Sequence, residues 1–298
     1  MSGGGPEIVV LIAPVHDCLN PVKIVPGGKE IDPSSLRWVL NPYDAFALEE
    51  ALRIRDAVPG ARIRVMAMAS SDSEEVLRGC LAVGADEALR IWDDRMEGSD
   101  AYATATALAA ALSREAFDLV LCGLRRADLE QAQTGPSLAE ILDLPQVTGA
   151  RKVEPVEDNT RILLHKRVPG YLTKLSCPLP ALVTMEKGQV LRYPSLAGRH
   201  RAARAEIPCL GVHTVGLQEG NVGSSGSLTR LERFTPPKPT RRSAMASTAG
   251  KMTAAARLQR IMGGGVQEKK DSKIWECPDE PSVKKVAEHI VKEKLITF

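Results

Sequence analysis

The chain has 298 residues, 44% of them hydrophobic and 26% charged, which is ordinary globular usage and excludes wholesale disorder. A net charge of +2 argues against a protein that binds nucleic acid through its phosphates. Aromatic residues make up only 4%, which gives few surfaces on which single-stranded bases stack. We therefore expect no nucleic-acid partner.

The first half of the chain alternates predicted strands and helices. Apolar, often β-branched runs predict buried strands at 8–13, 63–69, 86–91 and 117–122. Capping residues and helical spacing predict helices that start at 41–42 and at 71–75, and further helices over 99–114 and 134–142. This alternation predicts an α/β fold, with a parallel sheet and helices on both faces. Ligands then bind beyond the carboxyl ends of the strands.

From residue 146 the pattern changes. An antiparallel extension of the sheet is predicted from four short strands that return on themselves, at 147–153, 160–168, 171–176 and 181–185. A basic loop at 192–200 leads into another helix, and the composition of 218–251 predicts an extended arm. Residues 282–296 place Val283, Val286, Ala287 and Ile290 on one helical face. We expect this amphipathic helix to pack on a partner subunit, with its own domain as the alternative.

Most catalytic and metal motifs are absent. The sequence has no GxxxxGK[ST], GxGxxG, HExxH or GxSxG motif. The six cysteines form no CxxC pair and the five histidines lack ligand spacing, so we expect no metal site. The N-terminus has no basic leader, and its apolar run at 8–15 is far shorter than the roughly 20 residues of a membrane span. These features predict a cytoplasmic protein that does not insert into a membrane.

One loop, at 123–136, combines the features of a phosphate site. It joins a predicted strand to a helix N-terminus, where Gln133-Thr134-Gly135 offers an amide, a hydroxyl and close backbone approach beside free N–H groups. Arg125 and Arg126 can add charge-assisted contacts. Asp128 and Glu130 oppose an anion, so they must point away or bind a sugar hydroxyl. The alternative is a polar loop that only caps the helix.

Five stretches in one order, within residues 8–204, carry a resemblance: NPYD at 41–44 with EEAL at 49–52, GAD at 84–86, DLVLCG at 118–123 followed by QTGP at 133–136, LPALVT at 179–184 and RYPSL at 192–196. They resemble motifs of the electron transfer flavoprotein β subunit. The resemblance implies an α/β domain related to the adenine-nucleotide α-hydrolase-like fold over 1–204, with a partner-recognition loop at 184–204. Residues 205–298 then form a C-terminal arm whose terminal helix packs on the α subunit of a heterodimer.

The resemblance also implies a function. The chain is expected to be an electron carrier rather than an enzyme, linking a flavin dehydrogenase of the acyl-CoA type to a quinone reductase or another acceptor as transient partners. Flavin-based bifurcation is an open variant, because the sequence at 226–230 and 234–237 resembles the arm of the nitrogen-fixation-associated and bifurcating branch. This favours FAD on the chain; the alternative is AMP on the chain with FAD on the partner subunit. A stand-alone adenine-nucleotide sensor of the universal-stress type is the rival function.

By the same resemblance, the cofactor-binding residues fall at two strand ends, the Asn-Pro turn and the Gln-Thr-Gly loop. They are Ala13, Pro14, Val15, Asn41, Pro42, Tyr43, Asp44, Ala69, Ser70, Gly123, Leu124, Arg125, Arg126, Ala127, Asp128, Gln131, Ala132, Gln133, Thr134 and Gly135. Leu196 takes the place of the leucine that docks into a dehydrogenase; the alternative is a buried helix residue. The family's Lys after the first strand is absent, and Val15-His16 stands there.

Overall fold

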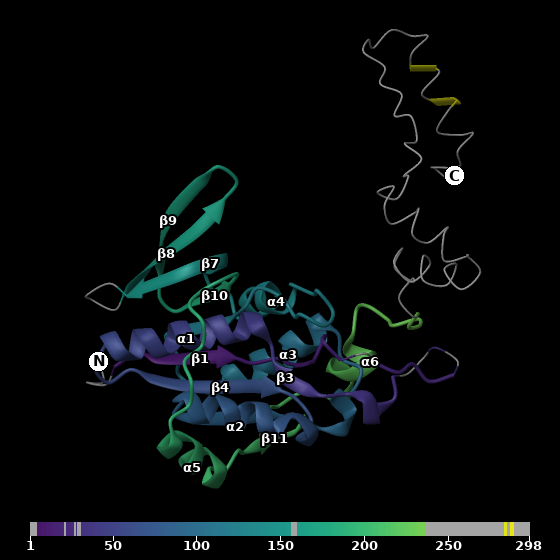
Figure 1. The fold of residues 1–298 in the computed structure, drawn as a ribbon, viewed down its shortest axis with the longest axis horizontal. Coiled ribbons are helices and arrows are strands. Elements are labelled where there is room, and N and C mark those ends of the chain that lie inside the picture. The colour runs from purple at the N-terminus through teal and green to yellow at the C-terminus, as the bar shows by residue number, and fades with distance from the viewer. Residues whose placement is uncertain are drawn as a thin grey trace, which may run out of the picture. The chain divides into compact units, whose positions relative to one another are not determined.

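The computed structural model describes residues 5–20, 22–26, 28, 31–155 and 160–235, together with Val283, Lys284, Ala287 and Glu288. The chain divides into two units, Met1–Thr235 and Pro236–Phe298. The first unit holds the sheet and its covering helices (Figure 1).

The described residues contain one nine-stranded sheet of order β11-β5-β4-β1-β6-β10-β7-β8-β9. Pairing is parallel from β11 to β7 and antiparallel between β7, β8 and β9. The strands are β1 Glu7–Leu11, β4 Arg62–Met68, β5 Glu87–Ile91, β6 Leu119–Gly123, β7 Gln146–Pro155, β8 Arg161–Val168, β9 Tyr171–Pro178, β10 Ala181–Met185 and β11 Cys209–Leu210. The predicted α/β class is confirmed.

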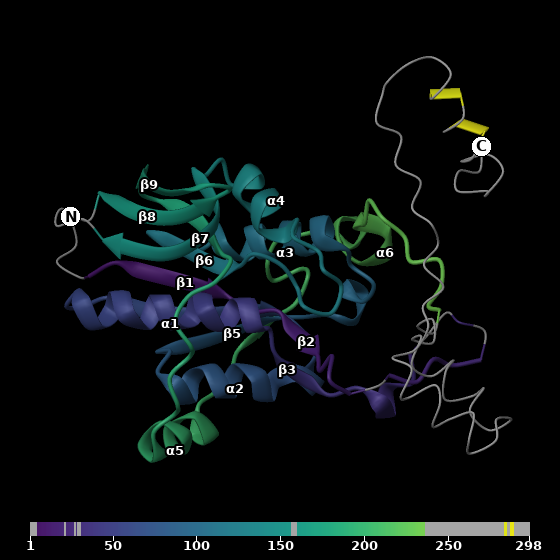
Figure 2. The ribbon, with the colours of Figure 1, turned by 45° about the horizontal axis from the view of Figure 1, so that its top comes forward.

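Helices cover both faces of the sheet (Figure 2). Side chains alternate along a strand, so Ile8 and Val10 of β1 join one core and Val9 and Leu11 the other. The first core is covered by α1 (Pro42–Ala57) and α2 (Glu74–Val83), and the second by α3 (Ala101–Leu112) and α4 (Thr134–Ile141). The four predicted helices are present, and each starts at the carboxyl edge of the parallel strands.

The strand at 181–185 differs from its prediction. β7, β8 and β9 return on themselves as expected, and Figure 1 shows β8 and β9 standing away from the rest of the sheet. β10 instead lies between β6 and β7, parallel to both. All five of its residues are buried, and an uninterrupted apolar run of this kind is typical of a central parallel strand.

Residues 205–235 belong to the first unit, so this unit continues past the boundary expected at 204. β11 adds to the sheet edge, Val212, Val215 and Val222 are buried, and Gly223–Gly226 form α6. Within 218–235, the part up to α6 is packed rather than extended, because Val222 is buried in the second core. The rest of the arm, 236–251, and most of the helix expected at 282–296 lie outside the described residues, although Val283, Lys284, Ala287 and Glu288 are helical.

Two short strands escaped prediction: β2 (Pro14–His16) pairs with β3 (Trp38–Leu40) in a small antiparallel sheet. The helix expected after the basic loop is α5 (Leu196–Arg204), which starts inside the range expected for that loop. Within the part of the chain that is described, no helix combines the length and apolarity needed to cross a membrane.

Candidate functional site

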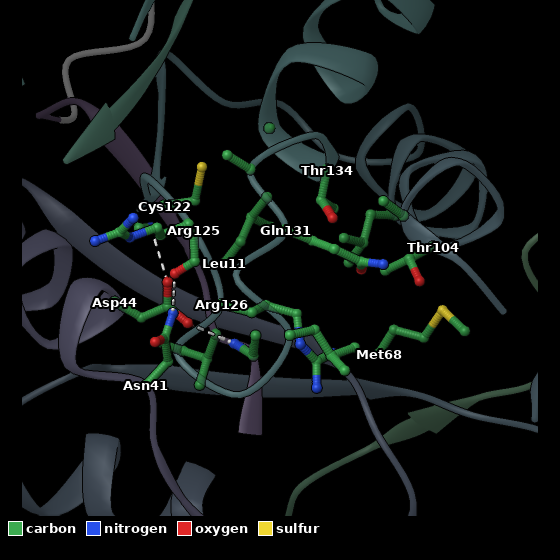
Figure 3. A pocket seen from close by; sticks show the side chains of 18 of the residues that line it. Leu11, Asn41, Asp44, Met68, Thr104, Cys122, Arg125, Arg126, Gln131 and Thr134 are labelled. Carbon is green, nitrogen blue, oxygen red and sulfur yellow. Dashed lines mark hydrogen bonds between the residues drawn. The ribbon is translucent and has the colours of Figure 1, made fainter. Parts of the chain in front are cut away.

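A cleft opens beyond the carboxyl ends of β1, β4 and β6, between the first turns of α3 and α4 (Figure 3). β1 is central: the chain goes from it to β4 and β5 on one side, then returns to β6 on the other. Crevices at such a reversal of strand order are where open α/β sheets bind ligands. The cleft lies on the α3 and α4 side of the sheet.

Asp44, in the first turn of α1, closes the floor of this crevice. Its carboxylate accepts hydrogen bonds from the amide of Ala13 at 2.7 Å and from that of Gly123 at 2.8 Å, so it joins the ends of β1 and β6. Burial raises the pKa of Asp44 to about 6, although these hydrogen bonds oppose the rise. A Cβ on Gly123 would lie 2.4 Å from an Asp44 oxygen, so this position admits only glycine.

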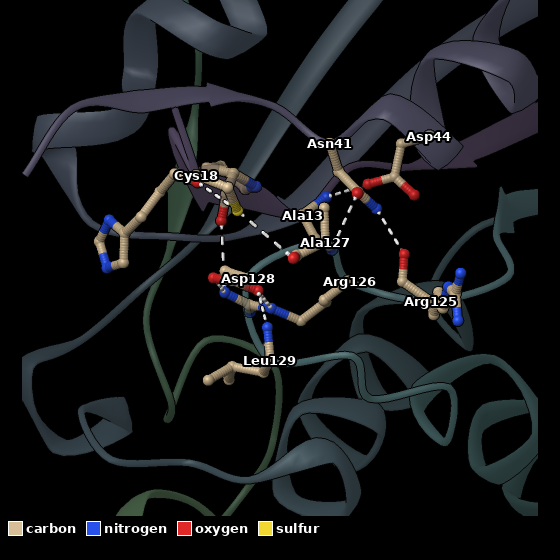
Figure 4. Close-up of polar contacts among 11 residues, drawn as sticks. Ala13, Cys18, Asn41, Asp44, Arg125, Arg126, Ala127, Asp128 and Leu129 are labelled. Atoms are coloured by element: carbon tan, nitrogen blue, oxygen red, sulfur yellow. Dashed lines mark hydrogen bonds and ion pairs between the residues drawn. The ribbon is translucent and has the colours of Figure 1, made fainter. Parts of the chain in front are cut away.

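Asn41 holds the loop that follows β6 (Figure 4). Its side-chain amide donates to the carbonyl of Arg125 at 2.9 Å, and its Oδ1 accepts from the amide of Ala127 at 3.3 Å. Asn41 is buried, and a buried amide with both ends satisfied fixes the backbone it touches. Asn41, at the N-terminus of α1, thus fixes the path of a loop that lies 84 positions later in the chain.

The two arginines of the loop are both engaged by protein groups. Arg125 donates to the hydroxyl of Tyr43 and pairs with Glu130 at 2.8 Å. Arg126 forms a two-point ion pair with Asp128, through Nε at 3.0 Å and a terminal nitrogen at 2.7 Å. Asp128 does not line the cleft, and its ion pair neutralises much of the charge of Arg126, which does.

His16 belongs to the Val15-His16 pair that stands where the resemblance leads us to expect Lys. Its ring packs on Trp38, with centroids 4.1 Å apart, and its Nδ1 is buried without a hydrogen-bond partner. Burial lowers the pKa of His16, so the ring is neutral at pH 7 and supplies no cation.

Two helix N-termini face the cleft, and only one is capped by a side chain. Asp100 caps α3: its Oδ1 accepts from the amides of Tyr102 and Ala103, both at 3.0 Å. At α4, Gln133 makes no side-chain cap, and first-turn amides have no acceptor within their own helix. The amides of Thr134 and Gly135 are therefore the donors best placed for an anion.

Gly135 lets α4 approach the sheet closely. A Cβ there would lie 2.8 Å from Cγ2 of Thr184 and 3.0 Å from the sulfur of Cys122. Burial raises the pKa of the Cys122 thiol, so this sulfur stays protonated and unreactive. The described residues contain no cluster of His, Cys, Asp or Glu that could hold a metal ion.

The structure brings just over half of the predicted cofactor residues together around the cleft. Those that line it are Ala13, Asn41, Asp44, Gly123, Leu124, Arg125, Arg126, Gln131, Ala132, Thr134 and Gly135. Those that do not are Pro14, Val15, Pro42, Tyr43, Ala69, Ser70, Ala127, Asp128 and Gln133. Val15 is buried within β2, while Tyr43, Ala127 and Asp128 contact the neighbouring residues described above.

The sequence did not predict the cleft residues that come from the start of α3, nor the apolar residues that line the cleft. The missed lining residues are Leu11, Ile12, Met68, Ser99, Asp100, Ala101, Thr104, Leu108, Cys122 and Leu129. A signal for the α3 residues was present, since a helix that follows a parallel strand begins at the carboxyl edge. The predicted start near Ser99 therefore belongs beside the predicted phosphate loop.

Leu196 does not line the cleft; it is the first residue of α5 and is 84% exposed. The alternative of a buried helix residue is wrong, because α5 packs on α2 through Gly198 and Ala202 instead. Tyr193, just before it, is 94% exposed. The loop has a firm base: Arg192 donates to Glu49 through its amide and guanidinium, and to Asp56 at 2.8 Å.

Comparison with known proteins adds the following. A family model described as the electron transfer flavoprotein domain matches residues 30–212. The chain is 37% identical over 237 residues to an electron transfer flavoprotein subunit beta of Thermoanaerobacterium thermosaccharolyticum, covering 79% of this chain and 90% of the relative. It is 34% identical to the caffeyl-CoA reductase-Etf complex subunit CarD of Acetobacterium woodii, covering 90% and 99%. It is 36% identical to the protein FixA of Sinorhizobium fredii, covering 78% and 84%.

Proposed function

The chain belongs to the electron transfer flavoprotein β-subunit family, and on this premise we propose that it pairs with an α subunit in a cytoplasmic electron carrier. The carrier takes electrons from a flavin dehydrogenase of the acyl-CoA type and passes them to a quinone reductase or another acceptor. The family match over most of the chain does not favour a stand-alone nucleotide sensor.

The role of this chain is to hold an adenylate in the cleft, and one observation carries the proposal. Backbone amides meet at the cleft from three places: the ends of β1 and β6, the first turn of α3 and the first turn of α4. The amides at the strand ends already donate to Asp44, and those of α3 already donate to Asp100. The first turn of α4 remains for the phosphate, with the Thr134 hydroxyl beside it. Leu11, Met68 and Leu108 supply apolar surface for the adenine ring.

The residues present suit the pyrophosphate of FAD or the phosphate of AMP better than a triphosphate. Both arginines of the loop are paired with protein carboxylates, so backbone dipoles rather than free cations must stabilise the anion. FAD, when bound, supplies the redox chemistry, and the protein supplies binding and electrostatics. The resemblance of 226–230 to the bifurcating branch supports FAD over AMP on this chain.

Thr134→Ala tests the phosphate assignment. Loss of one hydroxyl donor is expected to weaken nucleotide binding by about 1 kcal/mol, or about fivefold in Kd. Isothermal titration of nucleotide-depleted protein with AMP and with FAD measures this change. Ser137→Ala is the matched control, because Ser137 lies one turn further along α4 and does not line the cleft. Equal affinities for both variants and wild type would contradict the assignment.

Counting the cofactors released from the denatured heterodimer tests the choice of nucleotide. About two FAD per heterodimer is expected if this chain binds FAD, and one FAD with one AMP if it binds AMP. Chromatography of the supernatant after acid precipitation gives both counts. A heterodimer that releases no adenine nucleotide beyond the partner's FAD would overturn the adenylate site.

A further inference from the structure

The segment 222–229, here called the rim segment, is bound to the wall of the cleft by Asp100. Oδ2 of Asp100 accepts from the amide of Leu228 at 2.9 Å, the amide of Thr229 at 2.8 Å and the Thr229 hydroxyl at 2.9 Å. Its Oδ1 caps α3. One carboxylate thus holds both the first turn of α3 and the rim segment, which are more than 120 positions apart in the chain.

The contact continues on both sides of Asp100. The Ser227 hydroxyl accepts from the amide of Asp100 at 2.9 Å and donates to the carbonyl of Gly223 at 2.7 Å. The Ser99 hydroxyl accepts from the amide of Gly223 at 2.8 Å. Ser99 and Asp100 also line the cleft, so the same short turn forms a wall of the cleft and the anchor of the rim segment.

The charge of Asp100 matters because the expected ligand is an anion. Burial opposes its ionisation, but hydrogen bonds from Ala103, Thr229 and Leu228 outweigh burial and hold the pKa of Asp100 below its ordinary value. With the rim segment bound, five donors compensate the carboxylate. With the segment detached, three of those donors are lost, and the negative charge at the cleft wall keeps only the two amides of α3 as donors.

We propose that attachment of the rim segment to the cleft wall and binding of the adenylate in the cleft are cooperative, with Asp100 as the positioning residue that couples them. The inference rests on the proposed function, in that the ligand is an anionic adenylate. Attachment of the segment weakens the repulsion between Asp100 and the phosphate, which strengthens nucleotide binding. By thermodynamic linkage the nucleotide strengthens attachment of the segment by the same factor.

Hydrogen exchange of the full-length chain in its heterodimer tests the coupling directly. We expect saturating AMP or FAD to slow exchange of the amides of Leu228 and Thr229 by about fivefold or more, the lower end of usual coupling factors. Protection near Thr134 with no change at 228–229 would overturn the coupling and leave the proposed function standing. No protection at either place would count against the adenylate site itself.

Variants separate the charge of Asp100 from its packing. Ser227→Ala with Thr229→Val loosens the segment and keeps the carboxylate, so the Kd for AMP is expected to rise by about fivefold or more. Asp100→Asn also loosens the segment, since its NH2 group cannot accept from 228 and 229, but it removes the charge and is expected to raise the Kd for AMP clearly less than the double variant does. Ser225→Ala is the matched control, because its hydroxyl bonds only to Val222 in the described chain.

The two results together decide the mechanism. Equal loss of AMP affinity in Asp100→Asn and in the double variant would show that charge is not the coupling element and would overturn the proposal. If Asp100→Asn does not fold, the double variant against Ser225→Ala still decides, because unchanged AMP affinity in the loosened segment contradicts cooperativity.

Discussion

Asp44 shows how one side chain can determine both a fold and the place of its ligand. Its carboxylate takes the two amides at the centre of the crevice, which an anionic ligand would otherwise bind. In the proposed site, this leaves the first turn of α4, on the other wall, for the anion. The sequence marks Asp44 as a candidate ligand contact, but its partners lie 31 and 79 positions away. Separations of this length leave no local pattern, so only the structure reveals that the Asp44 carboxylate binds these two backbone amides.

The buried Asp44 makes stability depend on pH in an unusual direction. Its pKa is about 6 in the folded chain against an ordinary value of 3.8, so the folded state binds a proton more tightly than the unfolded state. This contribution is complete below about pH 4 and is lost as the pH rises through about 6, an effect of about 3 kcal/mol.

Urea unfolding of wild type and Asp44→Asn between about pH 4 and pH 7 checks this sign. The variant is expected to lack the loss of stability that wild type shows over this range. Asp118→Asn is the control, since Asp118 also accepts a backbone amide, that of Glu7, at the opposite end of β6. Parallel pH profiles for wild type and Asp44→Asn would contradict the effect.

At the scale of elements, α1 connects three distant parts of the unit. Asp44 binds the strand ends, Glu49 binds Arg192 ahead of α5, and Glu50 accepts from the amide of Val153 in β7 at 2.7 Å. Burial raises the pKa of Glu50. The acidic pair at 49–50 therefore serves packing between elements, whereas the sequence presents it only as part of a family motif.

The contact of α4 with the sheet requires Gly135. Gly135→Ala is expected to destabilise the chain by about 1–3 kcal/mol, because its Cβ would overlap Thr184 and Cys122. Moving the first turn of α4 outward is also expected to weaken AMP binding.

Gly79→Ala provides the control, because a Cβ on this α2 residue meets nothing within 4 Å. It is expected to stabilise the chain by about 0.5–1 kcal/mol through helix propensity. Denaturant unfolding measures both variants. A Gly135→Ala variant as stable as Gly79→Ala would contradict the close approach of α4.

Elements with a clear periodicity of apolar residues or with capping residues could be predicted from the sequence. Elements that exist only through pairing with distant residues could not. The helices that start at Pro42, Ala101 and Thr134 carry caps or apolar faces of their own. β2 and β3 are three residues each and exist through pairing with one another. β10 was visible as a strand, but its place between β6 and β7 depends on register with residues far away.

At the scale of the whole molecule, the cleft and the exposed Leu196 are separate surfaces. α5 is fixed to α2, with a Cβ on Gly198 falling 2.2 Å from the carbonyl oxygen of Ala82 and with Arg78 donating to the carbonyls of Ala202 and Ala205. Leu196 and Tyr193 are thus exposed at the start of a helix that is firmly packed on α2. An exposed apolar pair of this kind suits a partner's pocket.

Leu196→Ala tests this docking role. The expected result is slower electron transfer from an acyl-CoA dehydrogenase to the heterodimer, with unchanged nucleotide content. Stopped-flow reduction of the flavin measures the rate, and Ala203→Ser, at another exposed position of α5, is the control. Loss of bound nucleotide in Leu196→Ala, or an unchanged rate, would contradict separate surfaces.

The position of β10 has a consequence for synthesis on the ribosome. β6 and β7 are complete once residue 155 has emerged, yet the strand that joins them ends at Met185. Until then the nascent chain carries two open strand edges, and open edges invite pairing with other chains. A truncated chain that ends between residues 155 and 185 is therefore expected to aggregate. A chain that continues past Met185 contains β10, which can pair with both β6 and β7.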